Sequence, residues 1–273
     1  MREICRIEEV HNILYDALCY LDDFCKKNKL KYFLSNGTLL GAAKYGDFIP
    51  WDDDVDVLMP RDDYDRLMKM LGINNERYRL LCVEQVPEWR MPYAKLSCEE
   101  TLVMEKEYDF GVSFGLSVDI FPIDNWSSFF CISWLQAFEC ECLKRMLVCS
   151  IGGDFYTTKT GLRRHILKVI WKEGKRLGYE KLQNTLLKKA RKYNNDKSKY
   201  AGCRAWTCHL YKEIFPSEHF KNVEYLDFRG RSFPTIKKYE NYLNRLYGNW
   251  RMELPIDKQH SNHEIKVWYR DAK

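Results

Sequence analysis

The sequence lacks the marks of several protein classes. No stretch approaches the roughly 18 consecutive apolar residues that cross a bilayer as a helix, and the N-terminus has no basic-then-apolar secretion signal. The eleven cysteines form no CxxC pair and have no regular spacing, which argues against a disulfide framework. No internal repeat, low-complexity linker or nucleic-acid-binding module is recognisable. We therefore expect a cytoplasmic protein with reduced thiols and no nucleic-acid partner.

The chain has enough apolar content for a folded core, and its charge is unevenly distributed. Its 273 residues are 45% hydrophobic and 15% aromatic, as in globular proteins. Residues 47–65 hold eight Asp and one Arg, which leaves 43 basic and 31 acidic residues elsewhere. Residues 159–204 hold fifteen Lys or Arg and three acids. This basic segment favours an anionic donor and an anionic or membrane-associated acceptor, and it equally fits a solvated helix pair.

The most informative stretch is IPWDDDVDVLMP at residues 49–60. Its bracketing prolines and its valines predict a short strand. Because side chains alternate along a strand, Asp54 and Asp56 share one face, and Asp52 joins them if the strand starts early. Two carboxylates about 6–7 Å apart repel each other unless a cation lies between them. Such oxygen ligands favour Mg²⁺ or Mn²⁺, so we predict a metal site; a solvated acidic turn is the alternative.

Two other carboxylate motifs are excluded. An EF-hand calcium loop that begins at Asp52 requires Gly at position 57 and Glu at position 63, where this chain has Val57 and Asp63. A phosphatase with a nucleophilic aspartate requires a separate acid–base partner, and the sequence shows no sign of one.

A further acid lies within a later apolar strand. Residues 116–121 predict a strand in which Asp119 and Phe121 face away from the neighbouring aliphatic residues. An acid at such a position is costly unless a metal or hydrogen bonds compensate it. We predict that Asp119 is a third carboxylate of the site, as metal ligand or general base; a buried Asp that caps a turn is the alternative.

Upstream of the acids, a glycine-containing turn connects a short strand at 31–34 to a short helix at 39–43. Its residues are Ser35, Asn36, Gly37 and Thr38. A strand-to-helix turn of this kind presents backbone N–H groups to an anion, and a hydroxyl adds a donor. We predict that it binds phosphate, although Asn-Gly turns are also common without any ligand.

Several segments of the sequence closely resemble the LicD family: YFLSNGTLLGA at 32–42, GDFIPWDDDVDV at 46–57, and shorter matches at 92–96, 118–124, 228–234 and 242–263. That family includes bacterial phosphocholine transferases that modify surface glycans, has the fukutin-related proteins among its relatives, and belongs to the nucleotidyltransferase-like superfamily. Two departures stand out. Ser35-Asn36 replaces two small residues, and His260 and His263 are separated where paired histidines are common, which leaves the role of either histidine open.

The resemblance implies a phosphotransferase with Mg²⁺ or Mn²⁺ as cofactor. It would transfer phosphocholine or a similar phospho-alcohol from a CDP-linked donor to a hydroxyl of a cell-surface glycan, such as lipopolysaccharide or teichoic acid, or of its lipid-linked precursor. Asp54, Asp56 and Asp119 would hold the metal, and Lys95, in a predicted strand at 93–97, would bind phosphate rather than lie exposed at a sheet edge. Such an enzyme would work in the cytoplasm, with peripheral contact to an anionic membrane at its inner face.

Two other functions stay open. A glycosyltransferase also clamps a nucleotide diphosphate through a metal on an Asp-x-Asp pair. A nonenzymatic scaffold with a decayed site is the other alternative, and the intact acids argue against it.

The transferred headgroup is predicted to be choline, with CDP-choline as donor and CMP as the released product. A quaternary ammonium donates no hydrogen bonds, so a protein selects it through aromatic faces and a nearby acid. By their sequence positions near the acids, Trp51, Trp89, Tyr93 and Phe121 are our candidates for that aromatic cage. The resemblance supports this prediction more than the aromatic content does, and ethanolamine or a polyol phosphate is the alternative.

The predicted fold is α+β: a nucleotidyltransferase-like mixed sheet with flanking helices over residues 1–124, covered by a mostly helical region over 125–273. We expect the two regions to form one compact unit. Apolar spacing predicts an amphipathic helix at 3–28. Residues 125–138 carry no charge, which fits a buried helix or an interfacial segment, and we predict a helix packed in the core. Asp124 is predicted in a turn or cap. A hairpin with its turn at Arg229-Gly230 and a helix ending at Gly248 complete the pattern.

Overall fold

The computed structural model describes the chain except residues 71–73, 106–107, 195–196, 262–265 and 272–273. Its helices are α1 Ile7–Asn28, α2 Asn36–Tyr45, α3 Arg61–Lys69, α4 Phe130–Ile151, α5 Gly161–Leu177, α6 Tyr179–Ala190 and α7 Tyr239–Tyr247. Its strands are β1 Arg2–Ile4, β2 Phe33–Leu34, β3 Val55–Pro60, β4 Tyr78–Leu81, β5 Ala94–Cys98, β6 Thr101–Met104, β7 Ser117–Asn125, β8 Tyr200–Cys203, β9 Phe215–Pro216, β10 Val223–Phe228, β11 Arg231–Ile236 and β12 Lys266–Tyr269. The predicted α+β class is confirmed.

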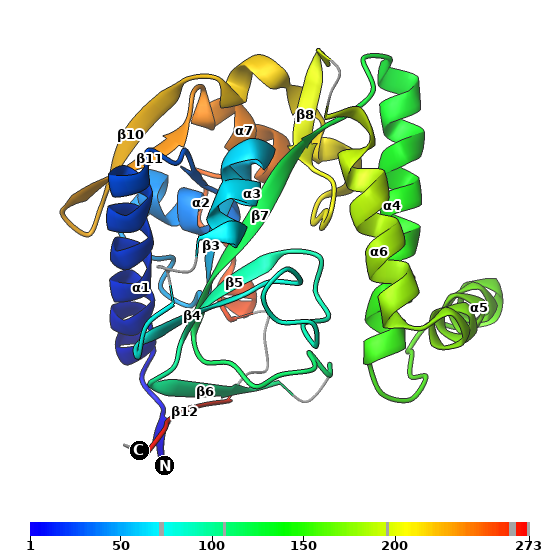
Figure 1. The fold of residues 1–273 in the computed structure, drawn as a ribbon, viewed down its shortest axis with the longest axis horizontal. Coiled ribbons are helices and arrows are strands. Elements are labelled where there is room, and N and C mark those ends of the chain that lie inside the picture. The colour runs from blue at the N-terminus through cyan, green and yellow to red at the C-terminus, as the bar shows by residue number, and fades with distance from the viewer. Residues whose placement is uncertain (71–73, 106–107, 195–196, 262–265, 272–273) are drawn as a thin grey trace.

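A mixed sheet organises the molecule. Its strand order is β10-β11-β2-β3-β7-β5-β4, and β8 and β9 extend it from β7. The pairs β3–β7 and β11–β2 are parallel, whereas β2–β3, β5–β7 and β4–β5 are antiparallel. In Figure 1, α1 and α3 cover one face of this sheet, and α2 and α7 lie on the other. Strand β7 runs through its middle and is buried along nearly its whole length, as its apolar sequence requires.

The sheet draws strands from both halves of the sequence. β11 pairs with β2 at Thr235 and Leu34, and β8 pairs with the end of β7. The predicted division at residue 124 therefore separates strands that share one sheet. A smaller sheet of order β1-β12-β6 lies where the two ends of the chain meet. Because Arg2–Ile4 pair there with β12, the first helix begins at Ile7 rather than at residue 3.

Two further expectations need correction. The apolar segment 125–138 is mostly not core: Trp126 is fully buried, but Phe129, just before α4, and Leu135 and Phe138 within it are exposed. Periodicity shows that such side chains share a face, but not whether another element covers it. Asp124 lies within β7, where its carboxylate forms a buried ion pair with Arg61 over 2.6 Å. No helix in the described part of the chain is long and apolar enough to cross a membrane.

The predicted hairpin and its turn are confirmed. Arg229 and Gly230 have φ values of 54° and 77°, the left-handed pair that a tight two-residue turn requires. Helix α7 ends at Gly248, with φ 71°. All eleven cysteines are free thiols, as predicted.

Candidate active site

Three predicted site residues form a row across three neighbouring strands. Asp56 of β3 lies opposite Asp119 of β7 in the parallel register, and Asp119 lies opposite Lys95 of β5 in the antiparallel register. Neighbouring strands are about 4.8 Å apart, so the three side chains emerge side by side from one face of the sheet. Strand β5 lies between β4 and β7, so Lys95 is not an edge lysine. It donates to both carboxylate oxygens of Asp119.

Asp56 is the most constrained acid of the row. Burial raises the pKa of its carboxyl well above the usual range, and the charges of Asp54 and Asp119 raise that pKa further. The side-chain amide of Asn36 donates to its Oδ2 over 3.1 Å and partly offsets this effect. A buried carboxylate next to two other acids is stabilised by a cation. This arrangement fits the pair Asp54 and Asp56 as ligands of a divalent ion.

Two carboxylates, rather than the three predicted, are arranged as possible ligands of a divalent ion. Within the described residues, no group of three or more His, Cys, Asp or Glu side chains is arranged to hold an ion. Asp119 instead pairs with Lys95, and the hydroxyl of Ser117 also donates to Asp119, over 3.3 Å. Mg²⁺ commonly uses one or two carboxylates and completes its shell with water and substrate phosphates. Asp54 and Asp56 meet that requirement, and the metal itself stays a prediction.

The turn at 35–38 supports the acid strand. The hydroxyl of Thr38 accepts a hydrogen bond from the backbone N–H of Asp56 over 2.8 Å, and the backbone N–H of Ser35 donates to the carbonyl of Asp56. Ser35 and Thr38 are both buried. A Cβ on Gly37 would lie 2.5 Å from Oδ2 of Asp52, so glycine is required for that carboxylate to approach the start of α2. The predicted phosphate-binding turn is therefore seen positioning Asp56 and Asp52.

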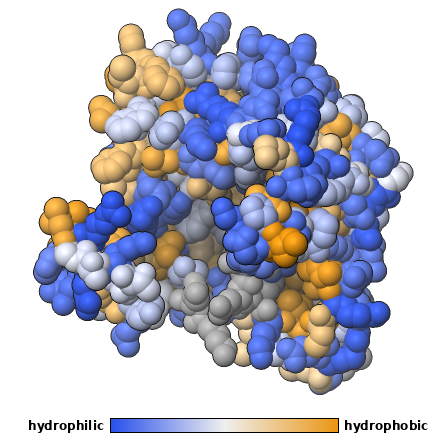
Figure 2. Space-filling model, turned by 180° about the vertical axis from the view of Figure 1, so that it is seen from behind, coloured by the Kyte–Doolittle hydropathy of each residue, from blue (hydrophilic) through white to orange (hydrophobic). Residues whose placement is uncertain are grey.

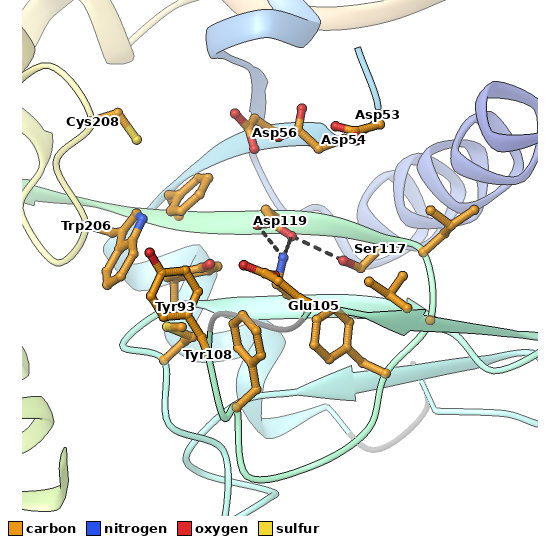
Figure 3. Close-up of a pocket in the computed structure, with 18 of the residues that line it drawn as sticks. Asp53, Asp54, Asp56, Tyr93, Glu105, Tyr108, Ser117, Asp119, Trp206 and Cys208 are labelled. Carbon is orange, nitrogen blue, oxygen red and sulfur yellow. Dashed lines mark hydrogen bonds and ion pairs between the residues drawn. The ribbon is translucent and has the colours of Figure 1, made fainter. Parts of the chain in front are cut away.

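A cavity of about 530 Å³ opens onto the row. Asp54, Asp56, Asp119 and Lys95 line it, whereas the side chains of the 35–38 turn do not. Figure 3 shows Asp54, Asp56 and Asp119 on one side of this cavity and Tyr93, Tyr108 and Trp206 gathered on another. Asp52 lies before β3, which begins at Val55, and it is not among the lining residues.

Only two of the four predicted cage residues line the cavity. Tyr93 and Phe121 do so, with ring centroids 4.6 Å apart. Trp89 is fully buried behind them, and its indole N–H donates to the carbonyl of Tyr93, so it supports the wall and cannot face a ligand. Trp51 does not line the cavity. Trp206 takes their place, with its ring 5.3 Å from that of Tyr93.

Sequence reasoning missed several lining residues from distant segments. Asp53, Glu105, Trp206 and Cys208 all face the cavity. Asp53 is buried and accepts a hydrogen bond from the hydroxyl of Ser261 over 2.7 Å, which brings the C-terminal segment to the acids. The unbroken triplet of aspartates was a signal for Asp53. No local pattern marks Trp206 or Cys208, which reach the cavity only through the fold.

A buried glutamate holds the loop that carries Cys208. Glu213 Oε1 accepts the backbone N–H groups of Cys208 and His209, each over 2.5 Å. Burial raises the pKa of Glu213 to about 7, although these two hydrogen bonds lower it. His260 is exposed and makes a hydrogen-bond contact with the carbonyl of Ser261. His263 lies outside the described residues.

Comparison with known proteins agrees with this geometry. The model of the LicD/FKTN/FKRP nucleotidyltransferase domain matches residues 29–139, the segment that supplies Asp54, Asp56, Lys95 and Asp119. Lipopolysaccharide cholinephosphotransferase LicD of Haemophilus influenzae is 26% identical over 96% of this chain and 97% of its own length. Human ribitol 5-phosphate transferase FKRP is 44% identical over 43 residues, which are 16% of this chain and 9% of its own. Residues 29–139 are therefore similar to the nucleotidyltransferase domain of the LicD/FKTN/FKRP family.

Proposed function

We propose that this protein is a LicD-like phosphotransferase that moves a phospho-alcohol from a CDP-linked donor to a hydroxyl of a glycan or of its lipid-linked precursor. The observation that carries the proposal is the row Asp56–Asp119–Lys95 at the cavity, in a domain whose family includes phospho-alcohol transferases. Two acids suited to a divalent ion next to a lysine suit a diphosphate substrate. CDP-choline is our first candidate donor, because the full-length relative is a cholinephosphotransferase.

The cavity residues have separate tasks in this proposal. Asp54 and Asp56 would hold Mg²⁺ or Mn²⁺, which supplies neutralisation of the charge that develops on the leaving nucleotide. Lys95 would bind a phosphate oxygen of the donor. Its present partner Asp119 would then be released to accept the proton of the attacking hydroxyl. Because Lys95 contacts both oxygens of Asp119, donor binding and the freeing of this base are coupled.

The turn residues act through Asp56. Thr38 and Asn36 fix its backbone and carboxylate, and the hydroxyl of Tyr242 donates to Oδ1 of Asn36 over 3.2 Å, which orients the amide N–H groups toward Asp56. These residues set the position of the carboxylate within the cavity. Precise placement of a ligating side chain by its neighbours is a general requirement of metal sites.

A donor panel tests the proposed function. The protein is incubated with Mg²⁺, a glycan acceptor and, in turn, CDP-choline, CDP-ethanolamine, CDP-glycerol or a nucleotide sugar, and nucleotide release is followed. We expect CMP release from a CDP-alcohol. Turnover only with a nucleotide sugar would contradict the proposal and favour the glycosyltransferase alternative.

A further inference from the structure

Helix α5 carries an exposed apolar stripe. Leu162, Ile166 and Val169 have exposed fractions of 75%, 51% and 59%. Their spacing of four and three residues places them on one side of the helix. A stripe of this kind is normally buried against another element, but in this structure it faces solvent. Among the described residues, no helix or strand covers this stripe.

Basic side chains border this stripe. Helix α5 contains six Lys or Arg and one acid, Glu173, which pairs with Arg176 over 2.6 Å. Lys168 and Lys172 are exposed and lie one turn apart on the flank of the stripe next to Val169. A helix with an apolar stripe and a basic flank is typical of segments that lie in the headgroup region of an anionic membrane.

The opposite side of α5 is firmly attached to the end of α4. A Cβ on Gly174 would lie 2.4 Å from the carbonyl oxygen of Met146, so the two helices touch through their backbones there. The ammonium of Lys175 donates to the carbonyl of Gly152 over 2.6 Å, and the indole of Trp171 donates to the carbonyl of Gly153. These contacts fix the apolar stripe on the outside of the lobe. In Figure 2 this lobe projects at the left, where hydrophobic and hydrophilic surfaces adjoin.

The attachment places α5 close to the candidate active site. Val148 of α4 lines the cavity, while Met146 and Cys149 of the same helical turn contact Gly174 of α5. One helix of about 10 Å diameter therefore separates α5 from the cavity. The backbone N–H of Asp109 also donates to the carbonyl of Ile151, which ties the cavity wall near Tyr108 to the end of α4. A surface to which α5 binds would therefore lie close to the cavity.

We propose that α5 docks the protein on an anionic phospholipid bilayer. The stripe Leu162–Ile166–Val169 enters the interfacial region, and Lys168 and Lys172 bind lipid phosphates. This docking would bring a lipid-linked acceptor to the cavity, and in that respect alone it rests on the proposed function.

Vesicle sedimentation of the full chain tests the docking. Vesicles contain phosphatidylcholine alone or mixed with phosphatidylglycerol, and binding is measured at low and high salt. We expect binding to the anionic vesicles that falls steeply as salt rises, because charges near the surface are screened. Lys168→Gln with Lys172→Gln should weaken this binding about tenfold or more. The matched control, Lys181→Gln with Lys188→Gln, removes the same charge from exposed positions on α6 and should change it little.

The apolar stripe is tested by Leu162→Ser with Ile166→Ser. Both side chains are exposed, so the variant should unfold at the wild-type temperature and lose anionic vesicle binding even at low salt. Equal wild-type binding to both vesicle types, unaffected by salt or by the α5 variants, would overturn the proposal. CMP release with a soluble acceptor is measured in parallel. Vesicle binding that fails while CMP release persists rejects only the docking, and the reverse result rejects only the proposed function.

Discussion

The ammonium of Lys95 donates to Oδ1 and Oδ2 of Asp119 over 2.5 and 2.6 Å, from the adjacent antiparallel strand. Both side chains are about nine-tenths buried. Removing one partner of such a pair leaves an uncompensated charge in a poorly solvated place. The pair therefore has a consequence for stability that is independent of any substrate.

Lys95→Met should lower the free energy of unfolding by about 3 kcal/mol, because the carboxylate of Asp119 loses its charge partner. Adding Asp119→Asn should restore most of that loss, since no buried charge then remains. Urea unfolding at neutral pH measures both effects. Lys266→Met, at an exposed strand position, is the control and should change stability little. If the two substitutions destabilise the protein additively, the pair is not coupled and the inference from its geometry fails.

Asp54→Asn or Asp56→Asn should weaken Mg²⁺-dependent donor binding by well over tenfold, which is a loss of more than about 1.4 kcal/mol. Each substitution keeps the side-chain volume but removes a charged ligand. Without metal, Asp56→Asn should maintain or raise stability, because it relieves the repulsion with Asp54 and Asp119. Titration calorimetry with donor, with and without Mg²⁺, measures donor binding, and thermal unfolding without metal measures stability.

Asp62→Asn is the control for this pair, because Asp62 is exposed in the first turn of α3, outside the cavity. Its donor binding and turnover should remain near those of the wild type. If the Asp54 and Asp56 variants both bind the donor with Mg²⁺ as tightly as the wild-type protein does, other residues hold the metal.

The sequence predicts those parts of the site that depend on neighbouring residues, but not those that depend on contacts between distant segments. A strand has a period of two, so the shared face of Asp54 and Asp56 follows from local order. The row with Asp119 and Lys95 depends on strand register between segments 24 and 63 residues apart. Register is set by the whole sheet rather than by either segment alone. The strand that carries Asp56 could therefore be predicted, although it begins at Val55, after Asp54, but the pairing of Asp119 with Lys95 could not.

The aromatic residues show the same limit. Trp51 and Trp89 are near the acids in sequence but do not line the cavity. Of the predicted cage, only Tyr93 and Phe121 do so, and Trp206 comes from the second half of the chain. The α+β class and most elements followed from periodicity. The exposure of Phe129 and Phe138 did not, because hydrophobicity identifies a face without showing what covers it.

Glu213 predicts a pH dependence of stability. Burial raises its pKa from an ordinary value near 4.5 to about 7 in the folded protein. Its contribution to stability is fully present below pH 4.5 and is lost as the pH rises through about 7, because the folded state must then bury a charge. Glu213→Gln retains the acceptor oxygen without this charge. The variant should therefore gain roughly 3 kcal/mol relative to the wild type between pH 4.5 and pH 8.

Urea unfolding across this pH range in the absence of metal measures the difference. Glu218→Gln, the same substitution at an exposed position, should show no such gain. A constant difference between Glu213→Gln and the wild type at every pH would mean that Glu213 does not titrate in this range.

The last prediction concerns the headgroup, for which Trp206 is the informative residue. Its ring and that of Tyr93 form an aromatic corner beside Asp56 and Asp119, and a quaternary ammonium binds to such faces without hydrogen bonds. Trp206→Leu should therefore lower kcat/KM for CDP-choline about fivefold or more while leaving kcat/KM for CDP-glycerol nearly unchanged. Trp134→Leu, on the exposed side of α4, is the matched control. An equal loss with both donors would show that Trp206 supports the cavity wall without selecting choline. A preference of the wild-type protein for CDP-glycerol would exclude the aromatic cage but would leave the metal chemistry of Asp54 and Asp56 intact.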